Sequence, residues 1–303
     1  MDSESYQNDN AKWQVIMMWI NLPVEDKLAI LGATERQVHI SNRAIEKDWW
    51  VTMVLQALFN SQFGQHLVFK GGTSLSKAWH LIERFSEDID IEINRDYLGF
   101  GGNLSKNRIS DRLRRASCSF VRNELSQALE KEMLEMGIPA KNFTITTTPS
   151  PVSTVDPEII YISYKSVFKE PAEYVKNVVL VEAGSRSMFT PNTVTSIQSF
   201  IGEFFPNSSF SDKPYSLRVA SASRTFLEKA FLLHEEFNKP VAEIRHLRMS
   251  RHLYDLEKMM DTQFATEALT NIELYKTIVE HRKKFIGLRG FNYDSLYPMT
   301  IVE

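Results

Sequence analysis

The chain has 303 residues, 43% of them hydrophobic, and its formal net charge is −3. This composition predicts a globular protein of one large or two modest domains, with no sign of nucleic-acid binding beyond what local patches could provide. The lone Cys118 excludes an intrachain disulfide, the polar start lacks signal-peptide features, and no early apolar run approaches the about 20 residues that span a bilayer, so we expect a soluble cytoplasmic protein.

The first elements read as helices. Residues 23–38 and 43–60 both carry helical patterns of apolar side chains. In the second segment Ile45, Trp49 and Met53 recur at four-residue steps within a wide apolar face. We therefore expect this helix to pack into the core and to end at the glycine that follows it.

The period of the pattern then changes twice. Residues 67–70 form a short apolar run that predicts a buried strand, and residues 74–85 have apolar side chains at helical spacing. Over residues 88–93 acids alternate with isoleucines, which predicts a strand with one apolar and one acidic face.

The rest of the chain predicts more strands and then helices. The expected elements are a loop over 94–103, a long helix over 108–137 closed by Gly137, strands over 143–148, 159–166 and 175–184, an irregular segment over 184–196, and helices after about residue 215, including 241–262 and 266–285. The apolar run 175–184 suits a central strand covered on both faces.

These elements predict an α+β protein in three parts. A helical lead-in over 1–60 packs on a mixed core over 61–212, and a helical part follows over 213–303.

The turn after the first strand has the composition of a phosphate-binding segment. Gly71 and Gly72 allow backbone N–H groups to approach a phosphate, and the start of the following helix favours negative charge. Thr73 and Ser74 add hydroxyls that could cap the helix or contact a phosphate oxygen. A glycine pair before a helix is by itself usually just a turn.

The acidic face of the 88–93 strand has the composition of a metal site. Asp88 and Asp90 are two residues apart and point the same way, so their charges repel unless a cation lies between them. Carboxylate oxygens suit Mg²⁺, which is often completed by substrate phosphates, and two such ions can serve phosphoryl transfer. An acidic strand face is by itself usually just solvated, but the order and spacing of the two motifs favour function.

Other nucleotide and metal motifs are missing from the sequence. There is no G-x-x-x-x-G-K-[ST], no G-x-G-x-x-G after the strand, no H-E-x-x-H and no cysteine pair. These absences argue against a P-loop NTPase, a Rossmann dinucleotide site and a zinc site. No G-x-S-x-G points to a serine hydrolase, although a Ser-His-Asp triad stays open.

The segment "FKGGTSLSKAWHLIERFSEDIDIEI", residues 69–93, resembles the signature of the AbiEii/AbiGii nucleotidyltransferase toxins. These toxins belong to the DNA polymerase beta-like nucleotidyltransferase superfamily, so the resemblance implies that core fold. Weaker similarities cover "EKDWWVTMVLQAL", "SRTFLEKAFLLHEE" and "SRHLYDL", which extends the resemblance from residue 43 to about residue 260.

The resemblance implies a role for each matching residue. The triphosphate would be held by Gly71, Gly72, Thr73 and Ser74. Apart from the resemblance, Lys70 could neutralise a phosphate and Arg251 could clamp the nucleotide, so both are candidate nucleotide-binding residues. Asp88 and Asp90 would bind Mg²⁺, and Lys229 and Asp255 would lie near the nucleotide or the acceptor. Glu182, at the end of the 175–184 strand, is our candidate for the superfamily's third carboxylate.

Several of these residues have an ordinary structural alternative. Lys229 could extend to solvent, and Lys70 could be a surface lysine at the end of its strand. Arg251 and Asp255, four residues apart, could form a surface salt bridge. Arg84 more readily orients a carboxylate than contacts substrate. His246 and His252 are better explained as surface or packing residues than as bases.

Two basic clusters remain outside the motifs. They consist of Lys106, Arg108, Arg112, Arg114 and Arg115 against Asp111, and of Arg282, Lys283 and Lys284. Each could follow an RNA backbone, or could simply be a solvated helix face.

The resemblance implies a metal-dependent nucleotidyltransferase that uses an NTP and Mg²⁺ to modify an acceptor hydroxyl, with the tRNA 3′ end favoured. It also implies a toxin of a bacterial toxin–antitoxin or phage-defence system, with an antitoxin encoded nearby that need not contact this chain. The alternatives are a protein or small-molecule acceptor, or a nucleotide-binding protein with a decayed site. The intact Asp-x-Asp favours an active enzyme.

Overall fold

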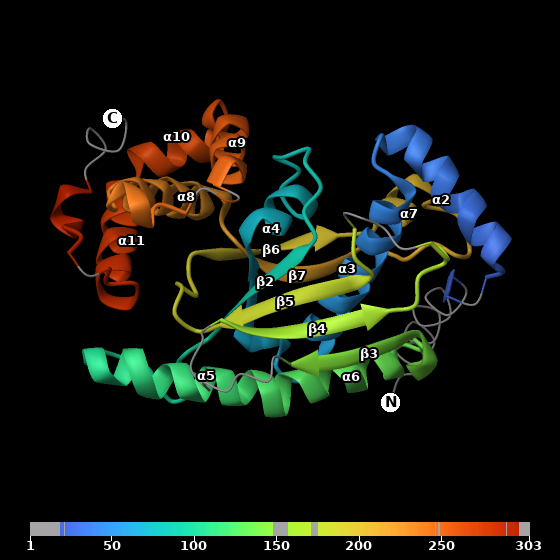
Figure 1. Ribbon diagram of the computed structural model, residues 1–303, viewed down its shortest axis with the longest axis horizontal. Coiled ribbons are helices and arrows are strands. Elements are labelled where there is room, and N and C mark those ends of the chain that lie inside the picture. Colours follow the sequence, from blue (N-terminus) through green and yellow to red (C-terminus); the bar gives the residue numbers. More distant parts are fainter. Residues whose placement is uncertain are drawn as a thin grey trace, which may run out of the picture.

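The computed structural model describes residues 19–20, 22–147, 157–170, 175–245, 247, 249–288 and 290–296. Within them the strands form one seven-stranded sheet of order β3-β4-β5-β2-β1-β7-β6. The strands are β1 (Leu67–Lys70), β2 (Asp88–Ile93), β3 (Phe143–Thr147), β4 (Glu158–Tyr164), β5 (Val178–Gly184), β6 (Asn192–Ile197) and β7 (Tyr215–Ala220). Figure 1 shows the sheet in the middle of the molecule, with the C-terminal helices gathered at one end. The fold is therefore the mixed α+β class that the sequence predicts.

The main core lies on the isoleucine face of β2. Ile89, Ile91 and Ile93 are fully buried in one cluster with Trp49 of α3 (Asn42–Asn60) and Leu129 of α6 (Ser126–Glu135). The predicted alternation is therefore confirmed, and the acids of β2 face the other side of the sheet.

The N-terminal helices agree with the sequence pattern. α2 spans Val24–Val38 and α3 spans Asn42–Asn60, and every α3 residue from Ala44 to Leu58 is buried. The helix ends at Asn60, before the predicted glycine, because Ser61 is extended with φ −60° and ψ 160°. Gly64 instead begins a short 3₁₀ turn, Gly64–His66.

The helix after β1 is shorter than predicted. α4 spans Gly71–Lys77 instead of residues 74–85. It ends because His80 adopts a left-handed φ of 52°, and the amide of Leu81 reaches back 2.9 Å to the carbonyl of Leu75. The irregular segment that follows carries Arg84 away from the helix axis.

The long helix over 108–137 is confirmed as one continuous helical run. It comprises the π-helical turns η2 (Arg108–Leu113) and η3 (Val121–Leu125), with α5 (Arg114–Phe120) and α6 between and after them. Gly137 closes it with φ 85°.

Strand predictions beyond this point are partly wrong. β5 is central, but Val179 and Val181 are buried while Leu180 and Glu182 are only half-buried, so one face is more open than predicted. The segment expected to be irregular contains β6, and the part expected to be helical begins with β7. β7 pairs in parallel with β1 at Phe69 and Val219, so the sheet extends to Ala220.

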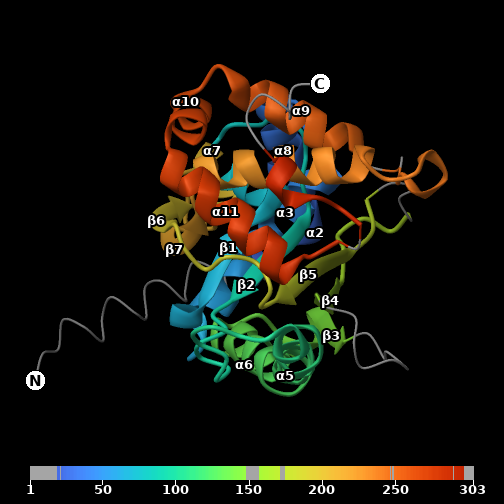
Figure 2. The ribbon, with the colours of Figure 1, turned by 90° about the vertical axis from the view of Figure 1, so that its left-hand side faces the viewer.

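The C-terminal helices form a second core. They are α8 (Ala222–Phe237), α9 (Met249–Met260), α10 (Gln263–Thr270) and α11 (Ile272–Phe285). Figure 2 shows them stacked together on one side of the sheet. Leu75 and Ile82, which flank the end of α4, pack into the same cluster as Phe231 and thereby dock these helices beside the glycine turn.

Two long C-terminal helices of the prediction are shorter or divided. The predicted helix over 241–262 begins as α9 at Met249, after a 3₁₀ turn at Val241–Glu243. The predicted helix over 266–285 is divided at Asn271, whose side chain caps α11 by accepting a bond from the amide of Leu274, 3.0 Å away. Among the described residues we find no helix whose length and apolarity would let it cross a membrane.

Candidate active site

The glycine turn and the acidic strand meet at Gly71 and Asp90. Gly71 has φ 79°, which favours glycine, and a Cβ built on it would lie 1.9 Å from Oδ2 of Asp90. Only a residue without a side chain allows the carboxylate to lie against the backbone here. The two predicted motifs therefore form one local structure.

The sheet places a second carboxylate beside Asp90. Lys70 of β1 is the register partner of Asp90, and Glu182 of β5 is its partner on the other side. Because directly paired residues project from the same face of a sheet, Glu182 lies next to Asp90. Asp88 lies two residues earlier on that face, and both aspartates are half-buried.

The charge of Asp90 is costly in this position. Burial raises the pKa of its carboxyl, and the neighbouring Asp88 raises it further, while Lys70 and Lys229 act in the opposite direction. The net effect is a raised pKa, which means that the folded chain disfavours the ionised carboxylate. A bound cation would relieve this cost.

The candidate metal ligands are few. Within the ranges that the structure describes, no three histidine, cysteine, aspartate or glutamate side chains come together so that they could hold an ion. Asp88 and Asp90 still offer the one or two carboxylates that Mg²⁺ uses when substrate phosphates complete its coordination. The oxygen donors and the raised pKa of Asp90 fit that ion.

A cavity of about 360 Å³ opens beside Asp90. Its walls come from Lys70, Gly71 and Asp90 on the sheet side and from helices α8 and α11 opposite, which contribute Lys229 and Arg282 among others. Asp88 is not among the described residues that line it. Gly71 and Asp90 are thus open to a ligand, whereas Gly72, Thr73 and Ser74 are not among the described residues that line the cavity.

Asp255 is held from two sides in this region. Arg84 donates from Nε to Oδ1 at 2.7 Å and from Nη2 to Oδ2 at 2.8 Å. Lys229 lies 2.9 Å from Oδ2, and the Asp255 side chain is fully buried. Burial alone would raise the pKa of Asp255, but the bonds from Arg84 and the charge of Lys229 outweigh it and lower the pKa.

The prediction that Arg84 orients a carboxylate is therefore confirmed, and the carboxylate is Asp255. Lys229 does not extend to solvent, since its side chain is only 8% exposed. The predicted alternative of a surface bridge between Arg251 and Asp255 is wrong, because Asp255 is buried and Arg251 is exposed. Arg251 is also not among the described residues that line the cavity.

His252 is the third group around Lys229. Its Nδ1 lies 3.4 Å from Nζ of Lys229, and burial together with that charge lowers the pKa of His252 to about 4. The imidazole is therefore neutral at pH 7. Arg248 and His246, which the sequence places on the same stretch, lie outside the described residues.

Lys70 is part of a network that the sequence does not reveal. Its Nζ donates to Oγ of Ser187 at 2.6 Å and lies 3.6 Å from Oε2 of Glu92. The amide of Ser187 donates to the same Glu92 oxygen at 3.2 Å. Glu92, the third acid of the β2 face, is therefore a buried partner for Lys70. This pairing helps to orient the Lys70 side chain toward the cavity.

The hydroxyls of the glycine turn bond within the protein. Thr73 donates to the carbonyl of Asp88 at 2.5 Å and contacts Oγ of Ser86 at 2.8 Å. Ser74 donates to the carbonyl of Gly71 at 2.8 Å. A Cβ on Gly72 would lie 2.6 Å from Nη2 of Arg84, so this glycine leaves room for that guanidinium.

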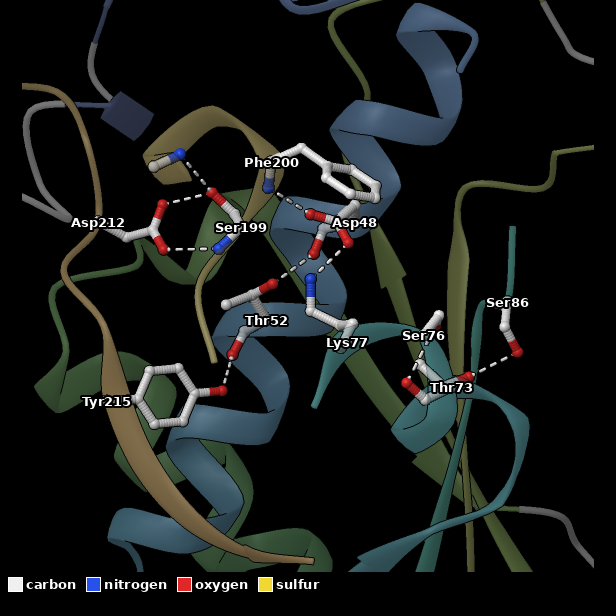
Figure 3. Close-up of polar contacts among 11 residues, drawn as sticks. Asp48, Thr52, Thr73, Ser76, Lys77, Ser86, Ser199, Phe200, Asp212 and Tyr215 are labelled. Carbon is white, nitrogen blue, oxygen red and sulfur yellow. Dashed lines mark hydrogen bonds and ion pairs between the residues drawn. The ribbon is translucent and has the colours of Figure 1, made fainter. Parts of the chain in front are cut away.

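A polar row on α3 supports these elements from behind. Lys47 pairs with Glu87, directly before Asp88, at 2.6 Å. Asp48 accepts a hydrogen bond from Nζ of Lys77, at the end of α4, over 2.5 Å. It also accepts one from the amide of Phe200, the first residue of α7 (Phe200–Phe204), over 2.9 Å. Figure 3 shows Asp48 between Lys77 and Phe200, and the hydroxyl of Thr73 in α4 facing Ser86 in the segment before β2. Lys47 and Asp48 of α3 thus fix the segment before β2 and the end of the glycine helix.

A mixed sheet, a glycine turn against an Asp-x-Asp strand and a lysine opposite define a nucleotidyltransferase core. The chain belongs to the AbiEii family, because the family model described as "Nucleotidyl transferase AbiEii toxin, Type IV TA system" matches residues 54–300. No curated protein is significantly similar to the chain.

Proposed function

We propose that this chain is a metal-dependent nucleotidyltransferase that acts as the toxin of its toxin–antitoxin pair. It would transfer a nucleoside monophosphate from an NTP to an acceptor hydroxyl. The observation that supports the proposal is the approach of Asp90 to Gly71 at one wall of the cavity, which suits a carboxylate that would hold a cation beside a turn that would bind phosphate.

The reaction forms one bond and breaks one. The acceptor oxygen attacks the α-phosphorus, the bond from that phosphorus to the bridging oxygen breaks, and pyrophosphate leaves. The hydroxyl proton passes to a nearby carboxylate or to water. Asp88 and Asp90 would hold Mg²⁺, which supplies positive charge for the transferring phosphate and the leaving group.

The chain's own residues would position the substrates. Lys70 and Lys229 project cationic groups into the cavity from opposite walls, where they can pair with phosphate oxygens. Asp255, fixed by Arg84, orients Lys229. Glu182 is the proposed third carboxylate, and its register position beside Asp90 supports that role.

The favoured acceptor is the 3′ end of tRNA, which rests on the resemblance to the toxin family. A protein or small-molecule acceptor is the alternative, and a non-catalytic nucleotide-binding protein is a second. A cognate antitoxin is implied by the type IV family.

The test is transfer of label from each of four α-labelled NTPs with Mg²⁺ to total cellular RNA. Asp88→Ala with Asp90→Ala is compared with wild type, and the matched control is Glu124→Ala with Glu130→Ala, two exposed acids on the long helix. We expect label on RNA with wild type and control only. Equal labelling by the aspartate variant would refute the metal site, and label only on protein would favour the alternative acceptor.

A further inference from the structure

The two basic clusters of the sequence meet in the folded chain. Nζ of Lys284 in α11 donates to Oδ1 of Asn103 at 2.7 Å. Phe285 of α11 is buried in a small apolar cluster with Ile109 and Leu113 of η2. Figures 1 and 2 both show α11 next to the start of the long helix. A stretch around residue 108 and a stretch around residue 284 therefore form one surface.

We call this the basic surface and define it by Arg95, Lys106, Arg108, Arg112, Arg186 and Lys284. Arg95 stacks over the ring of Phe285 at 4.2 Å, and Arg186 donates to the carbonyl of Phe285 at 3.1 Å, so both are gathered onto the end of α11.

The charges of this surface are largely uncompensated. Lys106, Arg108 and Arg112 are exposed, and among the described residues no carboxylate lies within salt-bridge distance of them. The nearby acid, Asp111, pairs instead with Arg114 and Arg115. A chain with net charge −3 thus concentrates unpaired positive charge at one place.

The basic surface adjoins the active-site cavity. A second cavity of about 300 Å³ is lined by Asn94, Arg95 and Phe189, and it shares Ser187 and His281 with the first. The two cavities therefore adjoin each other, and the second extends from the neighbourhood of Lys70 and Asp90 to Arg95 of the basic surface. The half-buried ring of Phe189 offers a face on which a base can stack.

We propose that the basic surface binds the phosphate backbone of a single-stranded RNA end, whose terminal hydroxyl reaches Asp90 through the second cavity. This inference rests on the proposed transferase function and assigns its acceptor site. Exposed cationic side chains and an accessible aromatic ring on the same approach to the site form the combination that binds single strands, because phosphates need charge and splayed bases need a stacking face.

The test measures binding of a short 5′-fluorescein-labelled single-stranded RNA by anisotropy, between about 50 and 200 mM salt. The surface variant carries Lys106→Gln, Arg108→Gln and Arg112→Gln. The matched control carries Lys141→Gln, Lys165→Gln and Lys213→Gln, three exposed lysines outside the basic surface. Heat stability with NTP and Mg²⁺ checks that nucleotide binding is unchanged.

We expect the surface variant to bind RNA at least tenfold more weakly. The slope of the logarithm of the binding constant against the logarithm of the salt concentration should become less negative by about 2, because each of the three lost phosphate contacts contributes about −0.7 to it. The control should match wild type. Wild-type affinity and slope in the surface variant, or an equal loss in the control, would overturn the proposal.

Two further outcomes separate this inference from the proposed function. If the wild-type protein transfers label to a protein and does not bind RNA, RNA binding by the basic surface is overturned while the transferase function stands. RNA binding that depends on the surface, without transfer from any NTP, supports the surface and removes the transferase.

Discussion

Arg84 and Asp255 form a two-point ion pair across 171 residues of sequence. Arg84 leaves the loop between α4 and β2, next to Gly72, whereas Asp255 lies in α9 of the C-terminal helices. The pair therefore ties the glycine turn to the helix that carries Asp255, and Asp255 in turn fixes Lys229.

Replacing Arg84 by methionine should destabilise the fold. Among the described residues, the change leaves the fully buried Asp255 with Lys229 as its remaining ion-pair partner. Removing one member of a buried pair costs about 3 kcal/mol or more. Urea unfolding measures this loss, and label transfer should fall with it. Arg251→Met, an exposed arginine of the same helix, is the control and should stay within about 0.5 kcal/mol of wild type. Equal stabilities for Arg84→Met and wild type would contradict the role assigned to the pair.

Gly71→Ala should abolish transfer. Gly71 and Gly102 both have positive φ, 79° and 70°, so an alanine costs about 1–2 kcal/mol at either position. Only at Gly71 does the new Cβ meet the Asp90 carboxylate, whereas nothing lies within 4 Å at Gly102. Gly102→Ala is therefore matched in backbone strain and should keep its activity. Similar activities in the two variants would show that contact with Asp90 does not matter.

Asp48 and Lys77 should be strongly coupled. Their side chains are 5% and 6% exposed, so Lys77→Met strands a buried carboxylate and should cost about 3 kcal/mol. In Lys77→Met with Asp48→Leu both charges are gone, although the amide of Phe200 loses its acceptor. A double-mutant cycle in urea should show that the double variant loses less than the sum of the two single ones. Additive losses would mean that the two side chains do not interact.

His281 should make the protein sensitive to acid. Burial, together with the charges of Arg95, Arg224 and Arg282, lowers the pKa of His281 to about 3, although Glu228 acts in the opposite direction. Below about pH 6.5, His281 binds a proton in the unfolded chain but stays neutral in the folded chain. The free energy of unfolding therefore falls as the pH falls from about 6.5 toward about 3.

His281→Phe removes the group that binds this proton and keeps an aromatic ring stacked on Phe285. Between pH 7 and pH 5 the variant should lose about 2 kcal/mol less stability than wild type, measured by urea unfolding at each pH. The control is His80→Asn, which removes an exposed histidine. Asparagine is chosen because the backbone at position 80 has a positive φ, which asparagine tolerates. Parallel pH profiles for wild type and His281→Phe would rule out this effect.

Local periodicity was enough to predict the elements that carry the site. The alternation over 88–93 and the four-residue steps in 43–60 both reflect a single face packed on the core, and both are confirmed. The strand Tyr215–Ala220 carries a similar alternation, with Tyr215 and Leu217 buried and Ser216 exposed, but it is short and leads directly into a helix. The signal is therefore present in the sequence, but its short length lets it merge with the helical pattern that follows.

Contacts between distant segments could not be predicted from the sequence. Lys229 is buried because Asp255 contacts it from another helix. Lys70 is held by Glu92 of β2 and by Ser187 of the segment after β5. Helical spacing also could not show that Asp255 faces inward while Arg251 faces out. Such facts depend on how the helices dock, which no local pattern records.

The order of the strands has a consequence for synthesis. β1 and β2 follow each other along the chain, but β7, Lys229 and Asp255 come much later, and β1 needs β7 as its second neighbour. A nascent polypeptide leaving the ribosome therefore exposes its glycine turn and aspartates long before the opposite wall has been translated. Truncated translation products would lack that wall, so toxicity would be confined to nearly finished molecules.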